Sequence, residues 1–217
     1  IRLSDDDCQF VWTHHHLILD GWSLPIILRD VFEAYAAACE GRVFNPPETP
    51  RPFRDYIAWL TQRDQHDDEA FWRPLLAKLE APTSVLIEDE SDRPLDAGCA
   101  QQQRVLDEKE SRHLQQMVRR HQLTLNTVCS SAWALLLSRY GGEERVSFGL
   151  TVSGRSGDLS ALSGMTGLLI NTLPCVIEVP AEQTALSYMQ QTQTFLQQLS
   201  RYEAVPLVNI RQWSVLS

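Results

Sequence analysis

Three consecutive histidines, His14-His15-His16, lie where an apolar segment of the chain gives way to an amphipathic one, and Asp20 and Gly21 follow closely. Half of the chain's six histidines fall in this tripeptide. The residues just before it include Phe, Val and Trp in succession, which are typical of a β-strand. The sequence therefore predicts a short strand over 8–13 that ends at the histidines.

An amphipathic helix is predicted directly after Gly21. Ser23 suits the N-cap position, and Pro25 suits the first helical turn. Apolar residues recur at helical spacing over 27–35, and the pattern ends near Gly41. The expected local structure is thus a strand, a turn that carries the histidines, and a helix.

Helices and strands alternate along the rest of the chain. Asp107 and Glu110 form a capping-box pattern, and Thr124 precedes an apolar helix that stops at Gly141-Gly142. Apolar residues alternate with small or polar ones in two predicted strands. The further predicted elements are helices over 53–62, 68–79, 107–120, 124–140 and 184–201, and strands over 146–152 and 173–179. This mixture predicts an α/β fold.

The composition divides the chain into two parts. A proline-rich connector over 45–52 leads into the last helices of the first part, and a charged segment then interrupts the apolar pattern. Such a segment is typical of a surface loop or of a linker between lobes. The predicted boundaries are 1–87 for the first part, 88–100 for the linker and 101–217 for the second part.

Charge and cysteine content exclude several classes of protein. The formal net charge of −9 gives no electrostatic reason to expect nucleic acid or an anionic membrane surface as a partner. No apolar run approaches the roughly 20 residues of a membrane-spanning helix. The five cysteines include no Cys-x-x-Cys pair, so a reduced, cytoplasmic chain is expected. The first residues lack both methionine and a signal peptide, which favours a segment of a longer protein.

The histidine cluster has several interpretations. A purification tag does not fit, because the run is short and lies inside an apolar context. A metal site would use His14, His16 and Asp20, since alternate residues of a strand share a face. A structural cluster satisfied by backbone groups is a second interpretation. In a third, one imidazole exchanges protons near neutral pH, because the ordinary pKa of histidine is about 6.5.

A proton-exchanging histidine suits acyl transfer. The attacking amine or alcohol must lose a proton in this reaction, and the tetrahedral oxyanion must be stabilised. No enzyme-bound nucleophile is evident, because the serines of Ser153-Gly154-Arg155-Ser156-Gly157 do not have the Gly-x-Ser-x-Gly spacing. The sequence therefore disfavours a covalent acyl-enzyme.

The segment His15-His16-Leu17-Ile18-Leu19-Asp20-Gly21 resembles the His-His-x-x-x-Asp-Gly motif of condensation domains from nonribosomal peptide synthetases, and of the wider chloramphenicol acetyltransferase-like superfamily. Four further segments resemble condensation domains, in the order of that family. They are Arg54-Asp55-Tyr56-Ile57-Ala58-Trp59, Val146-Ser147-Phe148-Gly149 with Ser153-Gly154-Arg155, Gly167-Leu168-Leu169-Ile170-Asn171-Thr172-Leu173-Pro174, and Val205-Pro206-Leu207 with Ile210 and Trp213-Ser214.

Departures from the family pattern are small. Leu169 stands where the family often has phenylalanine, and His14 adds a third histidine. The resemblance implies an α/β fold of chloramphenicol acetyltransferase type with two lobes. It also implies that the chain covers the end of the N-terminal lobe and most of the C-terminal lobe, about half of a family domain.

Residue roles follow from the same resemblance. His16 matches the second histidine of the motif and is expected to be catalytic, either as a general base or as a group that positions the acceptor amine. His15 is expected to be structural. Asp20 is expected to form a salt bridge with Arg155, so its role would be architectural rather than catalytic.

Two supporting residues have open roles. Gly21 would allow close approach of the backbone, and its amide is a candidate oxyanion donor, although a simple turn glycine fits as well. Asn171 lies near the channel between the lobes by family analogy, and a role at the start of a strand is the alternative. No metal is implied at any of these residues.

The resemblance further implies the substrates and partners. The expected reaction joins a donor acyl thioester to an acceptor aminoacyl amine, both held on phosphopantetheine arms of carrier domains upstream and downstream. No cofactor is expected to bind this chain directly, and an adenylation domain is expected next to it in the same megaenzyme. The alternatives are a freestanding acyltransferase that uses coenzyme A, and a truncated, inactive domain that only docks carriers. The chain alone is expected to be inactive.

Overall fold

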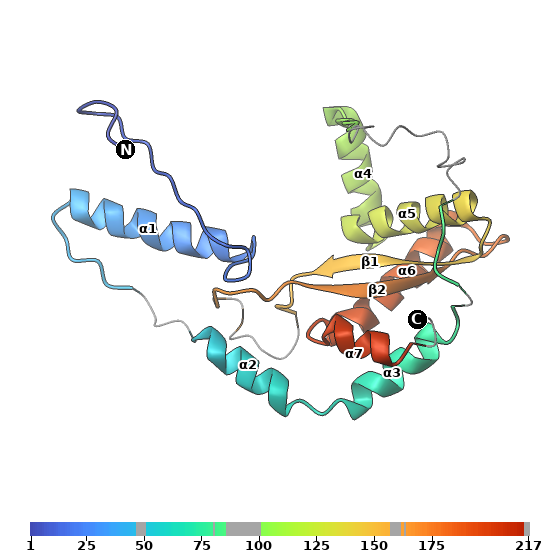
Figure 1. Cartoon of the computed structure of the whole chain (residues 1–217). Coiled ribbons are helices and arrows are strands. Elements are labelled where there is room, and N and C mark those ends of the chain that lie inside the picture. The colour runs from blue at the N-terminus through green and yellow to red at the C-terminus, as the bar shows by residue number, and fades with distance from the viewer. Residues whose placement is uncertain (47–50, 80, 86–100, 157–161, 163, 215–217) are drawn as a thin grey trace, which may run out of the picture. The chain divides into compact units, whose positions relative to one another are not determined.

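The structure is a computed structural model that describes residues 1–46, 51–79, 81–85, 101–156, 162 and 164–214 (Figure 1). The chain forms two compact units. Unit 1 comprises Ile1–Gln65 with Thr151–Asn171, and unit 2 comprises His66–Leu150 with Thr172–Ser217. The predicted linker at 88–100 lies outside the described residues, so the predicted boundaries stay a prediction.

The described residues of unit 1 include helix α1 over Ser23–Cys39 and helix α2 over Phe53–Gln62. Both helices were predicted from the sequence. The N-cap of α1 is Trp22, which makes no capping hydrogen bond through its side chain, so the prediction that Ser23 is the N-cap was wrong. Ser23 is the first helical residue instead, and its hydroxyl bonds elsewhere.

The predicted strand over 8–13 is not formed. The backbone there is irregular, apart from an isolated antiparallel bridge between Arg2 and Cys8. A strand requires a neighbouring strand to accept and donate its backbone hydrogen bonds, and no strand is paired with this segment among the described residues. The β-favouring side chains Phe10 and Val11 are exposed as a result.

A small apolar core holds unit 1 together. Tyr56, on the inner face of α2, packs with Leu162, Met165 and Leu169, which lie about a hundred residues further along the chain. Phe53, Trp59 and Leu60 pack against the same cluster. This core anchors the segment that precedes Asn171 to helix α2.

Unit 2 combines helices with most of a two-stranded sheet (Figure 1). The helices α3, α4, α5, α6 and α7 belong to it, as does a short 3-10 helix, η3. Strands β1 and β2 pair with one another; only the last two residues of β1 and the first residue of β2 belong to unit 1. The bounds are α3 His66–Leu76, α4 Glu108–Arg120, α5 Leu125–Gly141, β1 Arg145–Val152, β2 Asn171–Glu178, α6 Ala185–Leu199, η3 Ser200–Tyr202 and α7 Leu207–Gln212.

The capping signals in the sequence place these helices well. Asp107 and Glu110 form the predicted capping box of α4, with the amide of Glu110 donating to Asp107 Oδ1 at 2.7 Å. Thr124 Oγ1 accepts from the amide of Thr127 at 3.0 Å and caps α5. Helix α5 ends at Gly141 and is capped by Gly142, whose φ of +69° is left-handed, as a helix-stopping glycine requires.

Strand β2 is more deeply buried than its sequence predicts. Leu173, Cys175 and Ile177 are buried, in agreement with the alternating pattern. Val176, which points to the opposite face, is buried as well. Both faces of this part of β2 are therefore covered, which fits the mixed helix-and-sheet architecture predicted as α/β.

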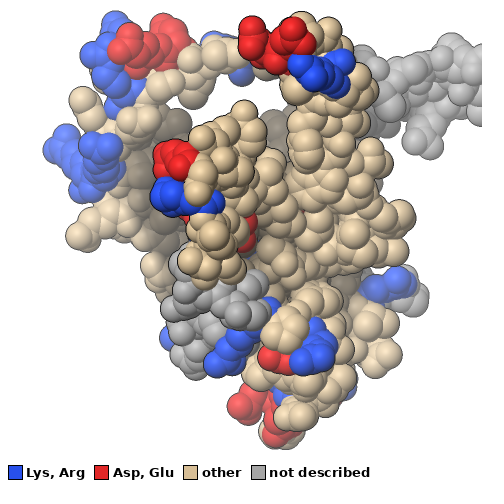
Figure 2. Space-filling model, turned by 90° about the vertical axis from the view of Figure 1, so that its left-hand side faces the viewer, with Lys and Arg blue, Asp and Glu red and all other residues tan. Residues whose placement is uncertain are grey.

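Charged side chains are dispersed over the surface. Figure 2 shows Lys and Arg lying beside Asp and Glu in small groups on the face that it presents. Several pairs in unit 1 are near neighbours in sequence: Arg2–Asp5, Arg29–Asp30, Arg42–Glu40 and Arg54–Asp55. Exposed pairs of this kind contribute at most about 1 kcal/mol each to stability. Among the residues that the structure describes, the helices lack the combination of length and apolar composition that a membrane span needs.

Candidate active site

The three histidines lie in an irregular loop that turns at His16. His14 is half-buried and its ring is tilted against that of Trp12, with centroids 5.0 Å apart. The amide of Leu17 donates to Nδ1 of His15 at 3.1 Å, which fixes that imidazole against its own turn. In the neutral ring the proton then lies on Nε2. His15 is exposed, and its structural role stays a prediction.

The His16 side chain is exposed, as are the apolar side chains of Leu17 and Ile18 that follow it. No hydrogen bond or ion pair is found for its imidazole within the part of the chain that the structure describes. An imidazole without a competing partner is available to a substrate. Its catalytic assignment stays a prediction, which this geometry permits.

Asp20, four residues further on, is almost completely buried at 1% exposure. Arg155 reaches it with two hydrogen bonds, from Nη1 to Oδ2 at 2.8 Å and from Nη2 to Oδ1 at 3.1 Å. The predicted ion pair is therefore present, and it has the two-pronged geometry that only arginine provides. It joins residues 135 positions apart in the sequence.

The remaining donors to Asp20 come from the backbone and from Ser23. The amides of Leu169 and Ile170 donate to Oδ2 at 3.0 and 3.3 Å. The Ser23 amide and hydroxyl lie 2.9 and 2.8 Å from Oδ1. Both carboxylate oxygens are thus engaged by N–H or O–H donors, so Asp20 is not free to coordinate a metal with His14 and His16. No group of three or more candidate ligands lies together among the described residues.

The pKa of Asp20 reflects this environment. Burial by itself raises the pKa, because the charged form loses hydration. The hydrogen bond from Arg155, those from Leu169 and Ser23, and the charge of Arg155 together outweigh burial and lower the pKa to about 2. Asp20 is consequently a permanent carboxylate near neutral pH, and it does not serve as a proton-transfer group there.

The turn that presents Arg155 needs glycine at Gly154. Its φ is +66°, and a Cβ there would lie 1.9 Å from the carbonyl oxygen of Leu169. The amide of Arg155 donates to Ser153 Oγ at 3.2 Å, and Nη1 of Arg155 donates to the Ser153 carbonyl at the same distance. Close approach of two backbone segments therefore sets the position of the guanidinium.

Gly21 is different, because a Cβ there would meet no described atom within 4 Å. The close backbone approach expected at Gly21 is found at Gly154 instead. A role for the Gly21 amide as oxyanion donor stays a prediction. Asn171 is half-buried and is the first residue of β2, which is the strand-start position that the sequence suggested.

Sequence reasoning identified Ser23 only as a helix cap and missed its place in the Asp20 cluster. Its hydroxyl lies 3.0 Å from both the amide and the carbonyl of Gly167. The spacing Asp-x-x-Ser at Asp20–Ser23 was a usable signal, because a side-chain oxygen three residues before a helical amide can accept from it. No pattern in the sequence predicted the contact between Ser23 and Gly167.

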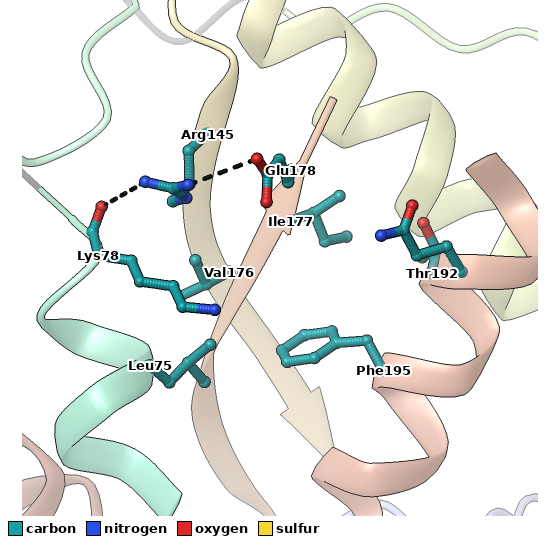
Figure 3. Close-up of a pocket in the computed structure, with 9 residues that line it drawn as sticks. Leu75, Lys78, Arg145, Val176, Ile177, Glu178, Thr192 and Phe195 are labelled. Carbon is teal, nitrogen blue, oxygen red and sulfur yellow. Dashed lines mark hydrogen bonds and ion pairs between the residues drawn. The ribbon is translucent and has the colours of Figure 1, made fainter. Parts of the chain in front are cut away.

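A separate cavity of about 160 Å³ lies within unit 2 (Figure 3). Leu75, Val176 and Phe195 form an apolar side, and Lys78 and Arg145 bring positive charge to it. Arg145 is already engaged, donating to the Lys78 carbonyl at 2.8 Å and pairing with Glu178 at 3.4 Å. None of the predicted site residues lines this cavity.

Solved structures define the class of fold. The first condensation domain of the calcium-dependent antibiotic synthetase, in complex with a substrate analogue, matches 92% of this chain and 46% of its own at a TM-score of 0.70 and 18% identity. The X-domain from teicoplanin biosynthesis matches 93% of this chain and 46% of its own, at a TM-score of 0.68 and 26% identity. The chain therefore has the chloramphenicol acetyltransferase-like fold of condensation-type domains.

Sequence comparison defines the family. The condensation-domain family matches residues 1–216. One of the linear gramicidin synthase polypeptides of Brevibacillus parabrevis is 40% identical over 218 residues, which cover 100% of this chain and 3% of that protein. The chain belongs to the condensation-domain family of nonribosomal peptide synthetases. It spans a small fraction of the curated relatives that it matches, and about half of the solved condensation-type structures.

Proposed function

We propose that the complete domain to which this chain belongs forms an amide bond between two carrier-bound substrates. The acceptor's aminoacyl amine attacks the donor's acyl thioester, a new C–N bond forms, and the phosphopantetheine thiol leaves. The observation that carries this proposal is the placement of His16, which is exposed on a loop anchored by the buried Asp20–Arg155 pair. A fixed loop with an available imidazole is what proton transfer from an amine requires.

The role proposed for His16 follows from its chemistry. An ammonium group must lose a proton before it can attack, and a further proton leaves as the tetrahedral intermediate forms. General base catalysis contributes roughly 10²- to 10⁴-fold, and correct positioning of the amine can contribute more. The Gly21 amide is the proposed donor to the oxyanion, with Asn171 as a supporting group.

The proposed partners are an upstream donor carrier domain, a downstream acceptor carrier domain and an adenylation domain in the same megaenzyme. Phosphopantetheine is part of the substrates in this proposal and is not a cofactor bound to this chain. We place the protein in the cytoplasm, which the four described free cysteines support. The names of the relatives support a product of the antibiotic type.

We further propose that the 217-residue chain is inactive alone. It covers 46% of each of the two matched structures, so more than half of such a domain lies outside it. Measurable amide formation by the isolated chain would contradict this part of the proposal. A truncated domain that only docks carriers is the corresponding alternative.

The test uses the complete synthetase module with both carriers loaded and detects the condensed product by mass spectrometry. We expect H16A to lower the rate of condensation by roughly 10²-fold or more. The matched control is H113A, which removes another exposed histidine, on α4, and should leave the rate within about twofold.

Two outcomes would overturn the proposal. If the wild-type module condenses none of the loaded substrate pairs tested, the proposed amide-bond formation is contradicted. Equal turnover of a soluble acyl-coenzyme A donor and of the carrier-bound donor would favour the freestanding acyltransferase instead.

A further inference from the structure

Ser23 forms a second connection between the histidine loop and the segment that leads to Asn171, next to the Asp20–Arg155 pair. The side chain is fully buried. Its hydroxyl lies 3.0 Å from the Gly167 amide and 3.0 Å from the Gly167 carbonyl, 144 positions away in the sequence. It also lies 2.8 Å from Oδ1 of Asp20 and 3.3 Å from Nη2 of Arg155.

From these contacts we propose that Ser23 is a positioning residue, whose hydroxyl holds the Gly167–Asn171 segment in register with the loop that carries His16. This inference rests on the proposed condensation function. Asp20 holds one part of that segment, through the amides of Leu169 and Ile170. At Gly167 the backbone amide of Asp20 donates to the carbonyl, and the Ser23 hydroxyl accepts from the amide.

The hydrogen-bond capacity of the hydroxyl shows what it alone provides. The hydroxyl has one proton and two acceptor positions. The Gly167 carbonyl also receives the backbone amide of Asp20 at 3.2 Å, so the serine proton is free to go to Oδ1 of Asp20. The Gly167 amide, in contrast, donates to Ser23 Oγ, and Gly167 is buried. Loss of the hydroxyl would leave that amide without its acceptor.

Packing around Gly167 restricts any alternative arrangement. A Cβ at Gly167 would lie 2.3 Å from the ring of Phe53, the first residue of α2. The segment is therefore pressed against a rigid aromatic side chain on one side. Without the serine hydroxyl, relaxation of the Gly167 amide toward water would require the segment to move, and Asn171 would move with it.

Removal of Ser23 differs from removal of Asp20 in a useful way. In S23A the carboxylate keeps both arginine bonds and the amides of residue 23, Leu169 and Ile170. No buried charge is left unpaired. The variant thus loosens one contact between the two segments while the ion pair stays intact, which separates positioning from folding.

The experiment compares S23A, S23T and the control S131A in the complete synthetase module. Ser131 is buried like Ser23, but its hydroxyl has no partner within the described residues. We expect S23A to lower kcat roughly 10- to 100-fold, as a displacement of about 1 Å would, with the KM for the acceptor carrier within about twofold. S23T keeps the hydroxyl and should restore most of kcat, and S131A should match wild type.

Amide hydrogen exchange provides the second readout, which does not depend on activity. The amide of Gly167 should exchange faster in S23A than in S131A, while helix α1 keeps its protection. If S23A does not fold, S23C carries the same prediction, because the thiol keeps the shape of the side chain and weakens its hydrogen bonds.

Two results would overturn the inference. One is a kcat for S23A equal to that of S131A in a module whose wild type condenses. The other is an S23T variant as slow as S23A although its Gly167 amide is protected. Failure of the wild-type module to condense would instead count against the proposed function, and the exchange measurement would still test the Ser23 contact.

Discussion

Buried polar side chains of the two units differ in how completely they are hydrogen-bonded, with an exception in each unit: Arg155 Nε of unit 1 has no partner among the described residues, and the buried Thr127 Oγ1 of unit 2 has one. In unit 1, Asp20 and Ser23 are buried with donors and acceptors on every oxygen. In unit 2, Ser131 Oγ and Trp72 Nε1 are also buried, and neither has a hydrogen-bond partner among the described residues. A buried polar group stabilises a fold only when it is satisfied. The hydrogen bonds of Asp20 and Ser23 in unit 1 therefore define one arrangement of the segments that they join, whereas Ser131 Oγ and Trp72 Nε1 of unit 2 add no hydrogen bond to their surroundings among the described residues.

This contrast matters because the polar cluster of unit 1 specifies a geometry that an apolar core does not. An apolar contact between the histidine loop and the 165–171 segment would bring them together with little directional preference. The Asp20 and Arg155 groups set distances and angles as well, because each donor must point at one oxygen. In unit 2 the stacked rings of Phe71 and Tyr202, with centroids 3.9 Å apart, stabilise the fold by burying apolar surface instead.

The largest expected effect follows from breaking the ion pair of unit 1. D20A leaves the Arg155 guanidinium, whose side chain is only 9% exposed, without its counter-charge. Loss of one partner of a buried pair costs about 3 to 5 kcal/mol, so D20A should unfold at a much lower denaturant concentration. H16A should unfold at the same urea concentration as the wild type, because His16 is exposed. Urea unfolding of both variants measures the difference, and equal midpoints would contradict the division between scaffold and catalyst.

The Asp20–Arg155 pair was also the part of the site most accessible to sequence reasoning, through the resemblance of Asp20 and Ser153-Gly154-Arg155 to family motifs. Caps such as Asp107 and Thr124 fixed helix starts, because capping is local chemistry. The strand over 8–13 was predicted wrongly, because a strand depends on a partner that a local pattern does not contain. The Ser23–Gly167 contact was out of reach for a similar reason, since it joins segments 144 positions apart.

A smaller loss of stability is expected at acid pH. It tests the Asp20–Arg155 pair without any substitution, because protonation removes the charge of Asp20. The pKa of Asp20 is lowered from 3.8 to about 2 in the folded chain. The folded state therefore binds this proton less readily than the unfolded state, and the resulting stability is present above about pH 4. It should be lost as the pH falls from about 4 to about 2, by roughly 2 kcal/mol in total. Unfolding free energies measured across this range should show the loss in wild type.

D20N is the control for the acid experiment, because an amide does not titrate. The wild-type and D20N curves should run closer together below about pH 2 than at about pH 5. A difference between them that stays constant over this range would mean that the carboxylate is not held in its ionised form by Arg155.

The smallest effect on stability is expected from S131A. The same substitution at Ser23 removes a hydroxyl that is hydrogen-bonded, so the two variants compare a partnered and an unpartnered hydroxyl directly. S23A should cost about 1 to 3 kcal/mol, since it leaves the buried Gly167 amide without an acceptor. S131A removes an unpartnered hydroxyl from the interior of α5, where alanine has the higher helix propensity. It should change the free energy of unfolding by less than about 0.5 kcal/mol, or raise it slightly.

Calorimetric scans of the two variants measure this directly. A loss of stability in S131A equal to that in S23A would show that the Ser131 hydroxyl has a hydrogen-bond partner in solution. The two units would then differ in how their buried polar groups are arranged, and not in whether these groups are hydrogen-bonded.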